Sequence, residues 1–399
     1  METKKRSYPW KWLVFTAFFG WVILYSNRSI LNPLMDVIQN QYDLNNTQLG
    51  MLTSVYFLTY TLAQIPSGLF ADLVGSKKVL SVCFVAFAFV NLLTGLNQSI
   101  VFYIILQGLA GLFAGLYYGP QYSLTYRLLP ENRRTLANAI INSGMAFGLS
   151  FGYLLSTNLV LIHQLPWHFP YLILVLPSLL IFFLFKRIVP NEEKVKVDSH
   201  QVIEKPKMID LFRNRQLMAS FIVNFASIYA YFVIVTWLPK FLISERGVPL
   251  GQVGWISSFV PWAALPSMLL IAHISDKFKT TLFYLKILIP ISVVAILFIA
   301  SAKSLVLISI ALLIYGFFGK LALDPLLIAY VGKNAPKNQL TTALSCLNFV
   351  GMSASVLAPL LTGILADIAG TMQVGFWLAA ILLVVGLITF IYNYKKASS

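Results

Sequence analysis

Charged side chains are scarce in this sequence. Only 11% of its 399 residues are charged, 58% are hydrophobic, and the mean hydropathy is +0.78. Soluble globular chains carry about 25% charged residues, so this composition excludes an ordinary soluble domain. The few charges are also unbalanced, because 14 acidic residues accompany 29 basic ones and give a formal net charge of +15.

Motifs for catalysis, metal binding and disulfides are missing too. The sequence contains no HExxH or Walker loop, and its four histidines are scattered in or near expected loops. Cys83 and Cys346 lie in separate apolar runs without CxxC spacing, so we expect two buried thiols. We therefore expect neither an enzyme nor a bound metal or cofactor.

Long apolar runs are abundant. A helix needs about 20 apolar residues to cross the hydrocarbon of a bilayer. Twelve runs meet this length, and we predict an all-α membrane protein with twelve transmembrane helices. The runs begin near Lys11, Thr47, Lys78, Ser99, Thr135, Trp167, Gln216, Leu250, Thr280, Lys303, Gln339 and Thr371.

The basic residues follow the order of these runs. With the N-terminus inside, 23 of the 29 lysines and arginines fall on cytoplasmic segments, which is the positive-inside pattern. The positive charge therefore predicts a multi-pass inner-membrane protein with both termini in the cytoplasm. It gives no reason to expect a nucleic-acid partner.

The sequence repeats itself weakly across its middle. A shift of 204 residues aligns Gln48-Leu49-Gly50 with Gln252-Val253-Gly254, and Asp72 with Asp276. Parallel six-helix repeats, related by an axis along the membrane normal, are one way in which transporters are built. We predict an N-terminal half (1–188), a polar cytoplasmic linker (189–214) and a C-terminal half (215–399).

The loop after the second run carries the sharpest local pattern. Residues 68–78 read GLFADLVGSKK, which resembles the G-x-x-x-D-x-x-G-[RK]-x-[RK] signature of the major facilitator superfamily. The resemblance implies the major facilitator fold and a cytoplasmic gate. The gating candidates are Gly68, Asp72, Gly75, Arg127, Arg134 and, from the second-half copy of the loop, Asp276.

A closer resemblance covers roughly residues 25–155. YSNRSILNPLMDVI, residues 60–68 (YTLAQIPSG) and residues 129–137 (LPENRRTLA) are similar to the anion:cation symporter branch of that superfamily. The resemblance implies transport of sugar acids, phosphate or other organic anions. The Tyr-x-Asp-Arg motif of the branch maps onto Tyr25, Asn27 and Arg28, and the position of its fourth-helix glutamate falls near Gly115. Both carboxylates of the branch are therefore missing, which leaves proton coupling open.

Two groups of charges interrupt the apolar runs. An arginine at the bilayer centre costs at least about 2.5 kcal/mol, so Arg28 either snorkels to headgroups, is paired, or binds cargo. Lys320 and Asp324 share one helical face and can form a neutral pair, either as a structural staple or as a coupling site for protons. Lys240 and Lys286 are expected at the membrane interface.

Tyrosines at positions 118, 122 and 126 form a stripe on the fourth helix. Such stripes are typical of packing or interfacial belts as well as of binding surfaces. If they line a site, polar side chains can bind a polyhydroxylated anion beside Arg28. The candidates are Tyr25, Asn27, Tyr60, Gln64, Gln121, Tyr122, Lys320 and Asn348.

Taken together, these patterns predict a secondary active transporter for a small organic anion, a carboxylate, sugar acid or phosphate-bearing compound, that works by alternating access. A proton or counter-anion and membrane lipids are its other expected partners, and we expect a monomer. A drug or lipid exporter and an uncoupled anion exchanger on the same fold stay open as alternatives.

Overall fold

The structure is a computed structural model that describes residues 10–130, 133–189, 208–277, 281–336 and 339–398. In these ranges the regular elements are helices, which confirms the predicted all-α membrane fold. Ten helical stretches are long and apolar enough to cross a bilayer. The other two expected spans correspond to α3 and to α12 followed by α13.

The elements follow the order of the apolar runs, with several runs divided by a turn. Their bounds are α1 (Trp10–Ile30), η1 (Asn32–Leu34), α2 (Met35–Tyr42), α3 (Asn46–Val74), α4 (Ser76–Leu96), α5 (Ile100–Gly115), α6 (Tyr118–Leu128), α7 (Arg134–Ser156), η3 (Thr157–Ile162), α8 (Phe169–Ile173), α9 (Val175–Ile188), α10 (Met208–Arg213), α11 (Arg215–Ser244), α12 (Leu250–Ser257), α13 (Phe259–Lys277), α14 (Thr281–Ser301), α15 (Leu305–Phe318), α16 (Lys320–Asn334), α17 (Leu340–Ala369) and α18 (Gln373–Ser398).

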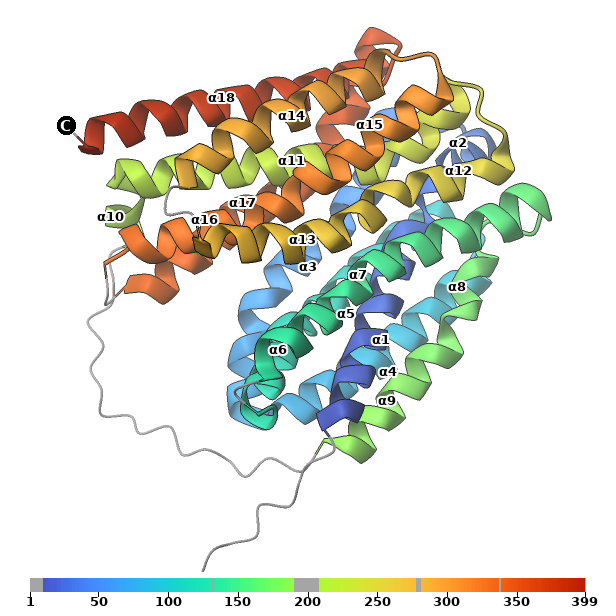
Figure 1. Cartoon of the computed structure of the whole chain (residues 1–399). Helices are drawn as coiled ribbons and strands as arrows, with labels where there is room; N and C mark the ends of the chain where they lie inside the picture. The colour runs from blue at the N-terminus through green and yellow to red at the C-terminus, as the bar shows by residue number, and fades with distance from the viewer. Residues whose placement is uncertain (1–9, 131–132, 190–207, 278–280, 337–338, 399) are drawn as a thin grey trace, which may run out of the picture. The chain divides into compact units, whose positions relative to one another are not determined.

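The chain divides into two compact units, and Figure 1 labels the helices that form them. Unit 1 consists of Met1–Leu31 and Leu58–Val197, and unit 2 consists of Asn32–Phe57 and Asp198–Ser399. The segment 32–57 therefore packs with the second half of the sequence. The division at a linker of residues 189–214 stays a prediction, because most of that linker lies outside the described residues.

In unit 1, α1 packs closely along α7 because α7 presents a stripe of glycines. Gly144, Gly148 and Gly152 are spaced four residues apart, so they share one helical face. A Cβ atom added to Gly144 would meet the Phe18 carbonyl oxygen, and one added to Gly148 would meet that of Val22. Small residues allow two membrane helices this close approach. The stripe thus fixes the position of α1 in unit 1.

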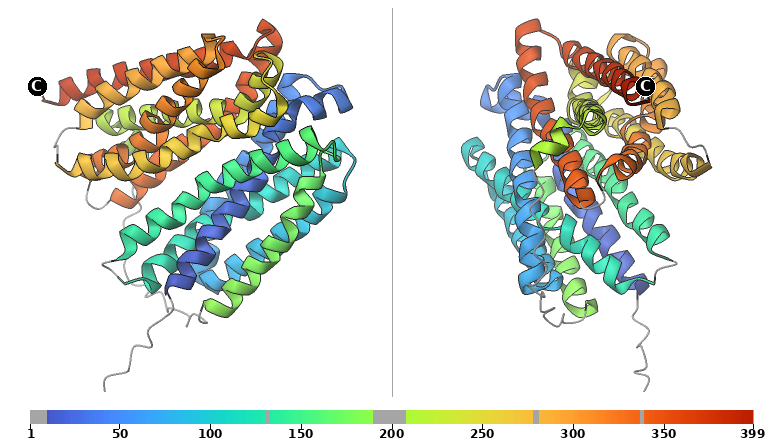
Figure 2. Two further views of the ribbon diagram at one scale, coloured as in Figure 1. Left: turned by 45° about the vertical axis from the view of Figure 1, so that its right-hand side comes forward. Right: turned by 90° about the vertical axis from the view of Figure 1, so that its left-hand side faces the viewer.

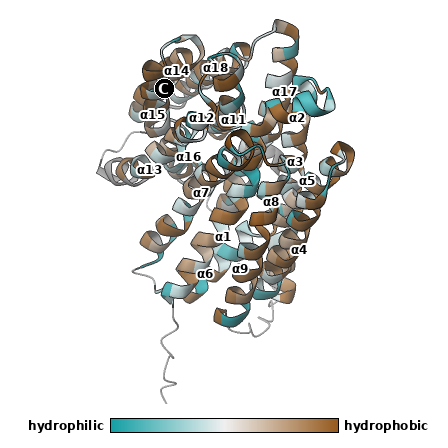
Figure 3. Cartoon of the chain, turned by 90° about the vertical axis from the view of Figure 1, so that its right-hand side faces the viewer, coloured by the Kyte–Doolittle hydropathy of each residue, from teal (hydrophilic) through white to brown (hydrophobic). Residues whose placement is uncertain are grey.

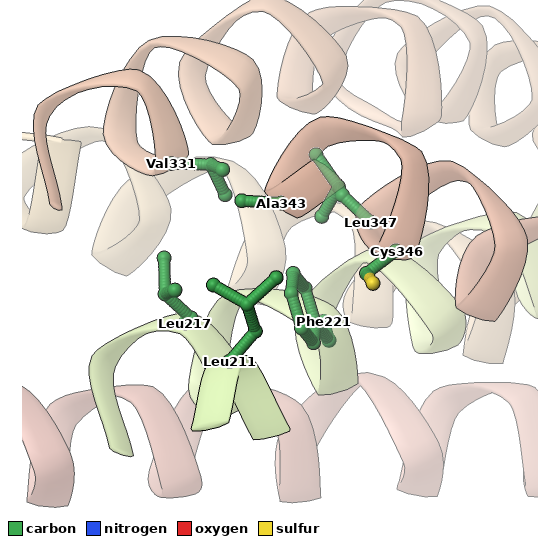
Figure 4. Packing of buried hydrophobic residues seen from close by; sticks show 7 residues of the cluster. All are labelled: Leu211, Leu217, Phe221, Val331, Ala343, Cys346 and Leu347. Carbon is green, nitrogen blue, oxygen red and sulfur yellow. The ribbon is translucent and has the colours of Figure 1, made fainter. Parts of the chain in front are cut away.

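In unit 2, α11 is the central helix and packs against α17 and α18, while α14 lies along α18 (Figure 2). Most of the α11 side chains from Leu217 to Leu242 are buried. An apolar cluster closes one end of this packing, where α10, α11, α16 and α17 meet (Figure 4). Its members are Leu211, Leu217, Phe221, Val331, Ala343, Cys346 and Leu347.

Hydrophobic residues, brown in Figure 3, make up much of the helical ribbon, and many of them are exposed. Leu176 is 75% exposed and Ile368 is 78% exposed. Extensive exposed apolar surface is unfavourable in water and is expected of a surface that contacts lipid. Both cysteines are buried free thiols, which confirms the expectation from sequence.

Candidate functional site

Arg28 lies in the last turn of α1 and is buried, with 9% of its surface exposed. Its guanidinium carbon is 4.7 Å from the ring centroid of Tyr25 and 5.7 Å from that of Tyr60, on α3. Cations are attracted to the faces of aromatic rings at such distances. The structure therefore places this charge inside unit 1 and does not show it snorkelling to a surface.

The turn that carries Arg28 is held by polar contacts on both sides. The Ser29 hydroxyl donates a hydrogen bond to the Leu149 carbonyl oxygen of α7 at 3.0 Å. The Asn27 amide donates to the Asn91 side-chain oxygen of α4 at 2.6 Å, and both asparagines are buried. Asn27, which replaces the acidic residue of the branch motif, thus forms a neutral amide pair. These contacts fix the rotation of α1 and with it the direction of Arg28.

Aromatic rings extend from Arg28 along the same unit. The Trp21 ring is 5.6 Å from that of Tyr25 and 6.2 Å from that of Tyr118, and Tyr118 is 4.8 Å from Tyr122. The Tyr122 hydroxyl donates to the Asn142 side chain at 2.8 Å. The rings of Tyr25 and Tyr60 thus contact Arg28, and Trp21 and Tyr118 connect Tyr122 to them in one group of rings.

Three other predicted binding residues lie on α6, α3 and α17. Gln121 is buried, and its amide donates to the Thr125 hydroxyl of its own helix at 2.7 Å. It precedes Tyr122 of the tyrosine stripe by one residue, which turns it about 100° around the helix. Gln64 is partly buried on α3, one turn beyond Tyr60, and its side chain forms a hydrogen bond with the Tyr60 hydroxyl. Asn348 is an exposed residue of α17 in unit 2.

The predicted pair of Lys320 and Asp324 is present in α16 of unit 2. The two side chains form an ion pair, and their exposed fractions are 16% and 28%. The Lys320 ammonium nitrogen is also 5.8 Å from the ring centroid of Tyr231 on α11. The pair is neutral and only partly shielded from solvent.

Lys240, which we expected at the membrane interface, is buried and paired. It is only 4% exposed and forms an ion pair with Asp36 of α2. Its ammonium group also donates to the Gln39 side-chain oxygen. Segment 32–57 folds onto α11 and covers Lys240, and this long-range contact encloses the side chain more than its sequence context indicated. Its expected place at the membrane interface stays a prediction.

The predicted gating residues are described only in part. Gly75 has a φ of 91°, a conformation that favours glycine, and it separates α3 from α4. Arg127 donates to the Ser76 hydroxyl at 3.4 Å, and the Arg134 guanidinium carbon is 4.2 Å from the Tyr126 ring centroid. Gly68 lies in α3 with open space at its Cβ position. The side chains of Asp72 and Asp276 lie outside the described residues.

Three residues of interest escaped the sequence reasoning. Trp21 precedes Tyr25 by four residues, so helical spacing could have placed it beside that ring. Asp36 precedes Lys240 by 204 residues, the shift that aligns the two halves. An aspartate and a lysine at equivalent positions do not count as similar residues, so the alignment did not draw attention to them. Asp367 caps α3 from α17, and no local signal indicates this contact.

Sequence comparison identifies the family. A model described as Major Facilitator Superfamily matches residues 17–359, with a second match over 242–399. The chain is 24% identical to an uncharacterized transporter, YybO, of Bacillus subtilis, over 98% of this chain and 95% of the relative. It is 23% identical to the probable galactarate/D-glucarate transporter GudP of the same organism, over 92% and 88%. The D-galactonate transporter of Escherichia coli O6:H1 is also 23% identical, over 91% and 90%.

Solved structures show the same fold. A bacterial homologue of the human lysosomal transporter Spinster, inward-facing and unoccupied, aligns with a TM-score of 0.79 at 15% identity over 98% of both chains. Its occupied form aligns with a TM-score of 0.78 at 14% identity, over 96% of this chain and 97% of the other. With a family match over most of its length and this fold, the chain belongs to the Major Facilitator Superfamily and is a multi-pass membrane transporter, not an enzyme.

Proposed function

We propose that this chain is a secondary active transporter that carries a small organic anion across the bacterial inner membrane by alternating access. The cargo is a carboxylate, a sugar acid or a phosphate-bearing compound, both termini are cytoplasmic, and the protein acts as a monomer. The observation that carries the proposal is the burial of Arg28 in unit 1 against the rings of Tyr25 and Tyr60.

The chemistry of Arg28 supports an anionic cargo. A guanidinium keeps its charge at any physiological pH and offers a planar set of donors that matches a carboxylate or phosphate. Keeping such a charge inside a membrane protein is costly, so intramembrane arginines usually serve a function. We assign Arg28 the role of gripping the charged end of the cargo.

The ring group around Arg28 supports a cargo with hydroxyl groups. Tyrosine combines an apolar ring face, which packs on C–H groups, with a hydroxyl that donates and accepts hydrogen bonds. The relatives named for galactarate, glucarate and galactonate transport handle compounds of this kind. A sugar acid would meet Arg28 with its carboxylate and the rings of Tyr25, Tyr60 and Tyr122 with its carbon chain.

A thermal-shift experiment on the purified protein tests this proposal. Galactonate, galactarate and glucarate would be compared with galactitol, which keeps the hydroxyls and lacks the carboxylate. A ligand at 100 times its Kd adds about 2.7 kcal/mol to the free energy of unfolding. We expect stabilisation by at least one acid and none by galactitol. Stabilisation only by lipophilic drugs or lipids would contradict an anion transporter and favour the exporter alternative.

We further propose that Asp324 couples transport to protons. In the resting pair the charges of Lys320 and Asp324 cancel. An anion that draws Lys320 away leaves the carboxylate unbalanced in a partly shielded position, and uptake of a proton neutralises it. Cargo and proton then bind cooperatively.

A specific observation favours an uncoupled exchanger as the second candidate. Asn27 holds the place of the branch's motif aspartate and is committed to Asn91, and an amide cannot carry a proton at physiological pH. Proteoliposomes with an imposed pH gradient separate the two cases. A coupled symporter accumulates its anion when the outside is acidified, whereas an exchanger responds only to anion on the opposite side.

A further inference from the structure

We infer that segment 32–57 is latched to the second half by an ion pair with a buried lysine and by a helix cap, and that this α2 latch must open once per transport cycle. The latch consists of Asp36, Gln39, Asn46, Thr47, Lys240, Ser244 and Asp367, all in unit 2. The inference rests on the alternating-access part of the proposed function. It does not depend on which cargo is carried.

The centre of the latch is the pair of Asp36 and Lys240. One oxygen of Asp36 pairs with the ammonium group, and the other accepts a hydrogen bond from the Ser244 hydroxyl at 2.8 Å. Lys240 also donates to the Gln39 side chain. Every charged atom of the pair therefore has a described partner. Lys240 is only 4% exposed, so removing Asp36 leaves a buried ammonium group without its counter-charge.

The second element is a cap on the first turn of α3. One oxygen of Asp367 accepts from the Asn46 backbone amide at 2.9 Å, and the other accepts from the Thr47 backbone amide at 2.8 Å. The Thr47 hydroxyl and the Asn46 side chain donate to the same carboxylate, at 2.6 and 2.8 Å. A carboxylate at a helix N-terminus is favoured by the unpaired amides and by the helix dipole. Here the carboxylate comes from α17, so the cap also joins two distant segments.

The backbones between these polar contacts approach closely. A Cβ atom added to Gly50 would meet the Pro359 carbonyl oxygen, and one added to Gly363 would meet that of Asn46. The Ser54 hydroxyl donates to the Val356 carbonyl oxygen at 2.6 Å, and Ser54 is only 5% exposed. The α3–α17 contact is therefore tight enough to exclude larger side chains. A thiol reagent that modifies this position would need the two helices to separate.

The place of the ion pair in the repeat explains why it must open. Asp36 and Lys240 are separated by the 204 residues that align the two halves of the sequence, so they occupy equivalent positions. In a parallel repeat the halves are related by an axis along the membrane normal. Equivalent residues touch each other only if both lie close to that axis. When the two halves move apart at this end, the pair separates directly.

Under the proposed topology this end faces the outside, because α1 begins on the cytoplasmic side at Trp10 and segment 32–57 follows its far end. The α2 latch then stabilises the state in which the outer side is closed. Weakening the latch shifts the population toward the outward-open state, because the equilibrium moves by the free energy that the closed state loses.

Cysteine labelling measures this shift without any cargo. A parent with Cys83→Ala, Cys346→Ala and Ser54→Cys would be treated with a membrane-impermeant maleimide on right-side-out vesicles. We expect Asp36→Asn and Lys240→Met to raise the labelling rate about tenfold or more. A tenfold change corresponds to a loss of about 1.4 kcal/mol from the free energy that favours the closed state over the open state. The wedge Gly50→Val should also raise it. Asp43→Asn is the matched control, because it removes an exposed carboxylate seven residues after Asp36. The backbone φ of Asp43 is 51°, a conformation that asparagine also adopts.

The charge-exchanged double variant, Asp36→Lys with Lys240→Asp, decides the inference even if a single variant folds poorly. We expect it to fold and to label as slowly as the parent, because the pair is restored. Rapid labelling of the double variant, or parent-like labelling of a folded Asp36→Asn protein, would overturn the latch. Loss of anion transport with a normal labelling response would instead count against the proposed cargo and leave the latch standing.

Discussion

Two lysine–aspartate pairs in unit 2 differ in what they connect. Lys320 and Asp324 are one turn apart on α16, whereas Lys240 and Asp36 join α11 to a segment 204 residues earlier. Lys240 is 4% exposed, and Lys320 is 16% exposed. Opening the first pair changes only the local charge of one helix. Opening the second removes one of the contacts that hold segment 32–57 to the rest of unit 2. We therefore assign coupling to the pair within the helix and closure to the pair between segments.

Removing the lysine of each pair should give the largest difference between them. Lys240→Met removes the ammonium group that pairs with Asp36, whose side chain is 23% exposed, and that donates to Gln39, a change that costs about 2 kcal/mol. Lys320→Met removes the partner of a more exposed group, and we expect about 1 kcal/mol. Thermal unfolding of the purified variants should show a clearly lower Tm for Lys240→Met, with the exposed Lys303→Met as control. Equal Tm shifts would remove the distinction between the two pairs.

Removing the carboxylate of the α16 pair should separate coupling from movement. Asp324→Asn keeps the shape of the side chain and cannot take up a proton. We expect counterflow exchange within a few-fold of the parent, while accumulation driven by external acid falls at least about tenfold. Uptake into proteoliposomes measures both quantities. An Asp324→Asn protein that still accumulates anion against its gradient would move the proton site elsewhere.

The smallest effect is expected at Asp72, near the end of α3. Asp72→Asn removes a charge from the loop that resembles the superfamily signature, next to Gly75 and its left-handed turn. If Asp72 acts as a cytoplasmic gate contact, the transport rate should fall several-fold and cargo affinity should stay unchanged, because a gate biases conformations without touching cargo. Initial uptake rates over a range of cargo concentrations check this split. An equal loss of affinity at normal turnover would argue for a binding role.

The sequence predicted features that depend on local spacing. The apolar runs gave the helices, because about 20 residues are needed to cross a bilayer. The four-residue spacing of Lys320 and Asp324 placed them on one face, where the structure shows an ion pair. The spacing of Tyr118 and Tyr122 likewise predicted neighbouring rings.

Features that depend on long-range contacts were beyond such reasoning. Arg28 was compatible with snorkelling, pairing or binding until Tyr60 of another helix was seen beside it. Nothing near Lys240 in sequence shows that Asp36 covers it. Periodicity fixes which face of a helix a residue occupies, and it does not fix which helix that face meets.

The most direct test of the central claim is the affinity of the purified transporter for the acid found by thermal shift, measured by titration calorimetry in the parent and in Arg28→Ala. Charge-assisted hydrogen bonds contribute about 1.5–3 kcal/mol each, so loss of a two-pronged grip should weaken binding at least about 100-fold. Arg28→Lys should restore only part of it, and the exposed Arg133→Ala should bind like the parent. Undiminished binding by a folded Arg28→Ala protein would contradict the assignment of Arg28 to the cargo.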